Sequence, residues 1–230
     1  MAQNRSLPVL RKWRKTTLTH VGNDIVDLTD QYAREKADDP RFVNRVLTPD
    51  EQECLASSDT PNHLLWAFWS AKETAYKIIS KSHPDVSSAP RRFDVTLEDT
   101  HNRITSGKVK TPYGVVHILV IFDNDYIHCV GVEDQHVTSK RIKHGMYFIG
   151  DKNCHNIKEQ AKTESMMARE AAKNGIASYL MLSPEDIDII RPKTSQRNTP
   201  PYVSINGKKI DIDISLSHDG KYVAYAFSVQ

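Results

Sequence analysis

The first candidate for chemistry is a carboxylate inside a strand-like run. Asp24 lies in V-G-N-D-I-V-D-L, and a carboxylate at the end of a strand is well placed to bind a hard cation such as Mg²⁺. Gly22 permits another backbone to approach closely. Most aspartates at strand ends form turns instead, so this motif alone leaves both interpretations open.

A second carboxylate and an amine lie one helical turn apart. Glu73 and Lys77 are at positions i and i+4 of a predicted helix, on the side opposite its apolar face. This spacing suits an acid for a metal and an ammonium for a phosphate oxygen, or a surface ion pair worth about 0.3–0.5 kcal/mol. Trp66 and Trp69 on the same side favour a pocket wall or an interface over a plain solvated face.

The third candidate is a histidine near the C-terminus. His218 lies beside Ser217 in S-L-S-H-D-G, at the end of an alternating strand. A loop histidine beside a hydroxyl and a turn glycine can contact a phosphate, or it can bond to its own turn. Asp211 and Asp213, just upstream, form a D-x-D that resembles a metal site. We interpret them as the solvent face of that strand, because the apolar residues alternate with them.

Two helices are expected to position these groups. The first has apolar residues at steps of three and four from Leu64 to Ile79 and should end before Pro84. Thr48 with Glu51 forms a capping box for a short helix ahead of it. The second long helix is predicted over residues 157–181.

The remaining elements read as strands. A strand-like start runs from Thr17 to Leu28, and three strands follow the first long helix at 91–98, 113–122 and 126–133. Residues 135–159 are a polar connector with one short strand, M-Y-F-I-G. After the second helix come a strand-like piece, S-P-E-D-I-D-I-I, a Pro-rich loop and two strands joined by the H-D-G turn. This mixture predicts an α+β fold.

The two halves repeat one order of elements. Each reads helix, strand, loop, strand, tight turn containing Asp, strand. We therefore predict two similar α+β modules, a pseudo-dimer in which each module packs a long helix on a small antiparallel sheet. The predicted boundaries are a basic arm at 1–20, a first module at 21–135 and a second at 136–230. An ordinary α+β chain with recurring hairpins is the alternative.

Composition excludes several classes. The chain has 230 residues, 39% hydrophobic and 26% charged, with a net charge of +2, which is typical of a folded globular protein and not of a disordered one. No run reaches the roughly 18 apolar residues of a membrane span. Three scattered cysteines predict neither disulfides nor zinc, and they favour a cytoplasmic location. Walker A, G-x-G-x-x-G, G-x-S-x-G and H-E-x-x-H motifs do not occur in the sequence.

Charge is informative only at the N-terminus. Five basic residues and no acid lie in the first 20 positions, which is typical of a solvated terminus or of an arm that attracts an acidic partner. Because no basic stripe extends further along the chain, we expect no nucleic-acid partner.

Taken together, the motifs resemble one family. V-G-x-D-I-V-D, R-V-L-T-x-x-E, W-S-A-K-E-x-x-x-K and S-L-S-H-D-G, in this order, look like the 4′-phosphopantetheinyl transferases. The resemblance covers about Val21 to Lys77 and the last strands from about Ile214. The resemblance implies Mg²⁺-dependent transfer of phosphopantetheine from coenzyme A to a serine of a carrier protein, with release of adenosine 3′,5′-bisphosphate.

The resemblance also implies roles for residues. Asp24 and Glu73 would be the metal-binding acids. The chemistry of such a transfer would let Glu73 accept the serine proton, directly or through a metal-bound water. Lys77 would touch a coenzyme A phosphate, and His218, with Ser217 beside it, would contact a phosphate on the adenosine side. Lys72 precedes Glu73 in the K-E pair of the motif, and the resemblance does not imply a definite role for it.

The chain departs from the family in its loops. K-S-H-P-D-V-S-S-A-P stands where a Gly-rich stretch is common, and T-P-P-Y replaces a G-K-P-Y loop, without its lysine. As a hypothesis, Arg197, or Arg91 with Arg92, supplies the missing cation for coenzyme A.

The resemblance bears on assembly as well. Single-module relatives are about half this length and trimerise, whereas two-module relatives are monomers with the site between modules. Here the acids lie in the first half and S-L-S-H-D-G in the second, the reverse of the usual tandem order. We therefore expect a monomer with one site between the halves and an acidic apo carrier protein as partner. A trimer grown by an insertion, and a non-catalytic module that binds carrier protein or coenzyme A, are the alternatives.

Overall fold

The computed structural model describes residues 19–99, 102–133, 141–150, 157–192 and 199–229. Its helices are α1 (Pro40–Val46), α2 (Pro49–Ala56), α3 (Pro61–Ser82) and α4 (Ile157–Leu180), with short 3₁₀ turns η1 (Lys36–Asp38), η2 (Pro90–Arg92) and η3 (Pro184–Asp186). Its strands are β1 (Val21–Asp27), β2 (Asp94–Leu97), β3 (Ile104–Thr111), β4 (Gly114–Phe122), β5 (Tyr126–Val132), β6 (Ile142–Phe148), β7 (Ile187–Ile190), β8 (Tyr202–Ile205), β9 (Lys208–Lys209), β10 (Asp213–Asp219) and β11 (Tyr222–Ser228).

The first half is a five-stranded sheet covered by α3. The strand order is β1-β5-β4-β3-β2, and every neighbouring pair is antiparallel. The sheet and α3 approach closely, since a Cβ added at Gly22 would lie 2.5 Å from the carbonyl oxygen of Thr74. Only glycine leaves room for this contact. The main core fills the space between α3 and the sheet.

The second half repeats the helix-on-sheet arrangement. A three-stranded antiparallel sheet, β10-β11-β6, carries α4 on one face, and a second small sheet, β7-β8-β9, lies beside it. Ile176, Ile214 and Phe227 are among the residues of a separate core under α4. Each half therefore has a hydrophobic core of its own.

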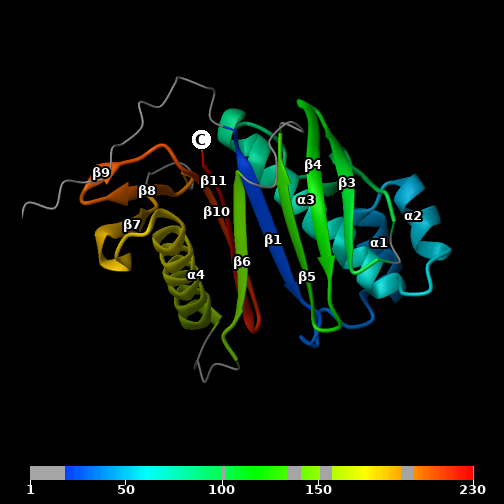
Figure 1. The fold of residues 1–230 in the computed structure, drawn as a ribbon. Helices are drawn as coiled ribbons and strands as arrows, with labels where there is room; N and C mark the ends of the chain where they lie inside the picture. Colours follow the sequence, from blue (N-terminus) through cyan, green and yellow to red (C-terminus); the bar gives the residue numbers. More distant parts are fainter. Residues whose placement is uncertain (1–18, 100–101, 134–140, 151–156, 193–198, 230) are drawn as a thin grey trace, which may run out of the picture.

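The two sheets pack face to face, so that the layers run α3, first sheet, second sheet, α4 (Figure 1). Two small apolar clusters join them. One contains Val21, Val130 and Ala226, and the other contains Ile25 and Tyr222. Burial of these residues stabilises the contact between the halves.

Side chains of β10 close the edge of β1. The backbone N–H groups of Val21, Asn23 and Asp27 donate to side-chain oxygens of Asp213 (2.7 Å), Ser215 (3.0 Å) and Asp219 (2.8 Å). Each of these three bonds joins residues 192 positions apart, so β1 and β10 run side by side in a fixed register. An edge strand that would otherwise present bare N–H groups is satisfied in this way.

Most predicted elements are confirmed. The helix over residues 61–82 ends before Pro84, α4 matches the second predicted helix, and the Thr48–Glu51 capping box is present. The strand β3 was not predicted, because its buried positions are mostly small or polar and give no apolar alternation. β6 is longer than M-Y-F-I-G and begins at Ile142.

Two interpretations of faces are wrong. Asp213 does not lie on a solvent face: it is 8% exposed and forms a 2.6 Å ion pair with Lys81 of α3. The polar face of β10 is turned toward β1, whereas Asp211, just outside the strand, is exposed. The predicted polar side of α3 is also partly core, because Trp66 and Ser70 are buried.

Candidate functional site

A hollow of about 380 Å³ lies where β1, α3 and the end of β10 meet. Asp24 and Glu73 of the first half and His218 of the second half all line it. Asp219 is the other lining residue from the second half. The remaining wall residues belong to the first half: Ile25, Val26, Asp30, Tyr32, Ala33, Phe42, Arg45, Trp66 and Trp69. The two tryptophans thus form part of a pocket wall, as the sequence predicted.

Lys77 ties the acid of β1 to the helix. Its Nζ donates to the Asp24 carboxylate at 2.7 Å and to the carbonyl oxygen of Asn23 at 2.9 Å. The side chains of Lys77 and Asp24 are 28% and 13% exposed, so the pair is only partly shielded from water. Lys77 does not itself line the hollow, but its amine is held against the carboxylate of Asp24, which does.

Burial raises the pKa of both acids. Burial raises the pKa of Glu73 to about 6, the charge of Asp24 adds to the rise, and Lys77 opposes it. Burial also raises the pKa of Asp24, against the lowering effect of Lys77 and His218. Two neighbouring carboxylates with raised pKa values are typical of a site that gains from a bound cation.

His218 reaches the hollow from the second half. It is exposed, and its Nδ1 lies 2.9 Å from the Glu164 carboxylate of α4. Such a contact orients the ring. Next to it, burial raises the pKa of Asp219 to about 7, with smaller contributions from the charges of Asp24 and Asp27. The site thus combines groups of both halves.

Ser217 points elsewhere. Its hydroxyl is buried and donates to the side-chain oxygen of Asn23 on β1. Sequence reasoning singled out Ser217 for coenzyme A, and that role stays a prediction. Asn23, Glu164 and Asp219 were not singled out as site residues, since each acts through a contact between segments far apart in the chain.

Arg91 and Arg92, two of the predicted replacement cations, do not line this hollow. Arg91 and Arg92 are exposed in η2, next to the carbonyl groups of Pro90 and Phe93 that accept from Lys72. Arg197 lies outside the described residues. The loop hypothesis for these arginines stays a prediction.

Lys72 is structural. Its Nζ lies 2.8 Å from the Glu51 carboxylate, and both side chains are almost fully buried, at 2% and 1% exposure. The carboxylate of Glu51 in turn accepts from the backbone N–H groups of Thr48 and Val95, both at 2.8 Å. Glu51 and Lys72, from two of the motifs, therefore join α2, α3 and β2.

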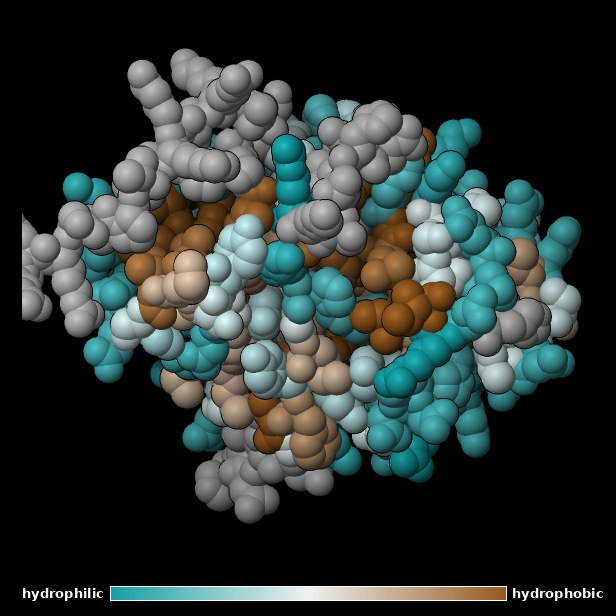
Figure 2. Space-filling view, in the orientation of Figure 1, coloured by the Kyte–Doolittle hydropathy of each residue, from teal (hydrophilic) through white to brown (hydrophobic). Residues whose placement is uncertain are grey.

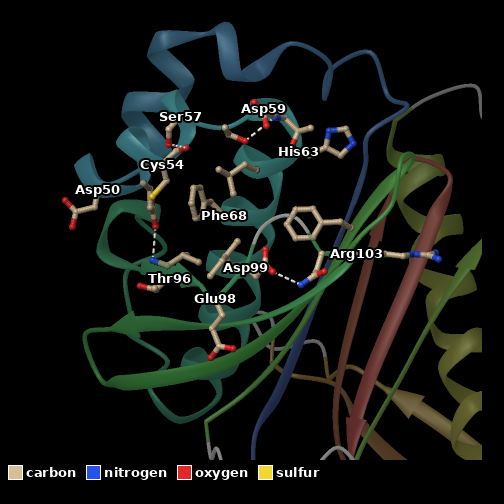
Figure 3. A pocket seen from close by; sticks show the side chains of 18 of the residues that line it. Asp50, Cys54, Ser57, Asp59, His63, Phe68, Thr96, Glu98, Asp99 and Arg103 are labelled. Atoms are coloured by element: carbon tan, nitrogen blue, oxygen red, sulfur yellow. Dashed lines mark hydrogen bonds between the residues drawn. The ribbon is translucent and has the colours of Figure 1, made fainter.

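A larger hollow of about 1190 Å³ lies at the other end of the first half, among α2, the start of α3 and the ends of β2 and β4. Figure 3 shows Phe68 in its wall and the acids Asp50, Asp59, Glu98 and Asp99 around it. The surface at this end of the molecule, over α1 and α2, is mostly hydrophilic (Figure 2). Asp24, Glu73, Lys77 and His218 do not line this hollow.

The donor set of the smaller hollow fits Mg²⁺. Asp24 and Glu73 offer hard oxygen ligands, and Mg²⁺ in proteins is commonly held by one or two carboxylates together with water and substrate phosphates. Among the described residues there is no cluster of three or more acidic, histidine or cysteine side chains that would enclose a metal entirely. A cation here would need ligands from the substrate as well.

The fold is a mixed helical and antiparallel-sheet one, the α+β class predicted from the sequence. Residues 20–130 match the family model of the 4′-phosphopantetheinyl transferase superfamily. This part of the chain therefore belongs to that superfamily, and the resemblance carried by the three motifs within it is confirmed. The S-L-S-H-D-G motif lies outside the matched residues. No curated protein matches the chain. Within the described residues, no helix is long and apolar enough to cross a membrane.

Proposed function

We propose that this protein transfers 4′-phosphopantetheine from coenzyme A to a serine of an apo carrier protein, with Mg²⁺. The observation that carries the proposal is the meeting of Asp24 and Glu73 with His218 around one hollow, although His218 lies in the other half of the chain. The superfamily match over residues 20–130 supports a transferase of this kind.

The reaction is a displacement at phosphorus. The serine oxygen of the carrier forms a bond to the β-phosphorus of coenzyme A, and the bond from that phosphorus to the bridging oxygen breaks. The electron pair leaves with adenosine 3′,5′-bisphosphate. Glu73 would accept the serine proton. Without a bound cation, burial raises the pKa of this carboxyl to about 6, which favours proton uptake.

Asp24 and Glu73 would hold the metal ion, which when bound would neutralise charge on the pyrophosphate oxygens. Lys77 would turn part of its hydrogen bonding from Asp24 to a phosphate oxygen. His218, held by Glu164 at 2.9 Å, would face the phosphate on the adenosine side. These groups position the anion and stabilise its charge.

We also propose that the chain is a two-module pseudo-dimer, 21–135 and 136–230, that works as a cytoplasmic monomer. In support, β6, α4, β10 and β11 follow the order of β1, α3, β4 and β5, and the strand order β6-β11-β10 parallels β1-β5-β4. The alternative remains a trimer. The basic arm at 1–20 would attract an acidic carrier protein.

The test is the intact mass of an apo acyl carrier protein after incubation with this protein, coenzyme A and Mg²⁺. We expect a gain of one phosphopantetheine group, lost on chelation of the metal. Glu73→Gln should lower the rate at least a hundredfold, because it removes both a metal ligand and the base.

The matched control is Glu170→Gln, which changes an exposed glutamate on α4. It occupies the place in the second half that Glu73 has in the first and should keep full activity. No mass gain on acyl, peptidyl or polyketide carriers, combined with measurable binding of coenzyme A, would favour the non-catalytic binding module instead.

A further inference from the structure

Asn23 contacts three parts of the site at once. Its side chain is fully buried, at 0% exposure, and it directly precedes Asp24. Its carbonyl oxygen accepts from Lys77, at 2.9 Å. Its side-chain oxygen accepts from the hydroxyl of Ser217, the residue before His218. Its backbone N–H donates to Ser215, at 3.0 Å.

These bonds cross the boundary between the halves. β1 is an edge strand of the first sheet, and β10 is an edge strand of the second. Side chains make the hydrogen bonds between them, so single hydroxyl, amide and carboxylate groups fix the register. Near the hollow the fixing contacts are Asn23 with Ser215 and Ser217, and Asp27 with Asp219.

The amide of Asn23 is not explained by packing alone. Its nitrogen is buried and has no hydrogen-bond partner among the described residues. A buried donor without a partner lowers stability, so an apolar side chain would serve a purely structural role better. The acceptor oxygen that holds Ser217 is what an apolar side chain would lack.

We infer that Asn23 and Ser217 form a positioning pair that sets the distance between the acids of the first half and His218 of the second. This inference rests on the proposed function. Neither side chain touches the substrate. Asn23 acts on Asp24 and Lys77 through its own backbone, and Ser217 acts on His218. Misplacement of reacting groups by about 1 Å can cost a hundredfold in rate, so one bond of this kind can matter for catalysis.

The test is a double-mutant cycle with Asn23→Ala, Ser217→Ala and the double variant. Each single variant should lower kcat/KM for transfer at least tenfold, mainly through kcat. Because the two residues act through one shared bond, the double variant should be no worse than the worse single one. Ser217→Thr keeps the hydroxyl and should recover most of the loss.

The matched control is Ser228→Ala. Ser228 is a buried serine of β11 whose hydroxyl also joins the halves, donating to the carbonyl oxygen of Thr19 at 2.9 Å, but at the far end of β1. It should change kcat/KM less than twofold. The unfolding temperature of each variant, measured by thermal denaturation, distinguishes a variant that is inactive because it unfolds from one that is folded but has misplaced site residues.

Two results would overturn the inference. One is single variants within twofold of the wild type while folded. The other is a double variant whose loss equals the product of the single losses, which would mean that Ser217 acts on coenzyme A directly.

Failure of the proposed function gives a different result. If the wild type binds coenzyme A and transfers nothing, the proposed function is wrong. The same double-mutant cycle is then measured as changes in the dissociation constant of coenzyme A, by calorimetry. The non-additive pattern supports the positioning pair there as well, and an additive one overturns it. A wild type that neither binds nor transfers overturns both.

Discussion

Lys72 and Glu73 are adjacent in one motif and do different work. Successive residues on a helix point about 100° apart, so the two side chains leave α3 toward different neighbours. Lys72 is buried against Glu51, whereas Glu73 is half-buried and faces the hollow beside Asp24. A short motif therefore holds one residue for the fold and one for the proposed chemistry.

Lys72→Met tests the structural half of this motif. It leaves the Glu51 carboxylate buried at 1% exposure without its counter-charge. Breaking a buried ion pair from one side costs about 3–5 kcal/mol, so we expect a loss of this order in the free energy of unfolding, measured by urea denaturation.

The double variant Lys72→Met/Glu51→Gln removes the stranded charge. It should recover at least about 1 kcal/mol of that loss, since a neutral amide is cheaper to bury than an unpaired carboxylate. A double variant less stable than Lys72→Met would contradict the structural role of the Lys72–Glu51 ion pair. It would mean that Glu51 acts mainly by accepting hydrogen bonds from the backbone N–H groups of Thr48 and Val95.

At the scale of elements, the contact between β1 and α3 sets the distance between the candidate site residues of the two elements. Gly22 lets β1 lie against the backbone of Thr74, and this brings Asp24 and Lys77 within 2.7 Å. A side chain at position 22 would separate the strand from the helix and would move the acid of β1 away from the amine and acid of α3.

Gly22→Ala should therefore lower both stability and activity. Gly107→Ala is the matched control, since its added Cβ would lie 2.5 Å from the carbonyl oxygen of Thr96, between β2 and β3. Both variants should lower the unfolding temperature. In steady-state assays well below it, only Gly22→Ala should lose about tenfold or more in transfer. Equal losses in the two variants would show that activity follows overall stability.

The elements also show how far the sequence predicts this structure. Strongly periodic segments such as α3 and α4, and local signals such as the Thr48 capping box, follow from short-range chemistry. The acids, Lys77 and His218 were singled out from the sequence because their motifs are specific, and the structure brings Asp24, Glu73 and His218 to one hollow. Their roles stay predictions. The contact between the polar face of β10 and β1 was not predicted. A strand that turns serine and aspartate toward another strand has the same alternation of polar and apolar residues as a strand that faces water.

At the scale of the whole molecule, the contact between the halves contains titratable groups. His128 of β5 is 1% exposed, and its ring lies 5.6 Å from that of His144 on β6. It lies on the face of the first sheet that carries Val130 and Ile25, the face packed against the second sheet. Burial, with smaller contributions from positive charge on His144 and Lys77, lowers the pKa of His128 to about 3.

This predicts a loss of stability in acid. In the unfolded chain a histidine takes up a proton near its ordinary pKa of about 6.5, whereas in the folded protein His128 stays neutral down to about pH 3. Between these values the unfolded state binds more protons, so stability falls as pH falls, by about 1.4 kcal/mol per pH unit for one such group.

Glu73 and Asp219, whose pKa values are raised to about 6 and about 7, act in the opposite direction. The difference between wild type and His128→Leu cancels their contributions. Urea denaturation of both proteins from pH 7 to pH 4 should therefore give a wild-type stability that falls more steeply than that of the variant. Parallel curves would mean that His128 is protonated in the folded protein and that the contact between the halves opens to water.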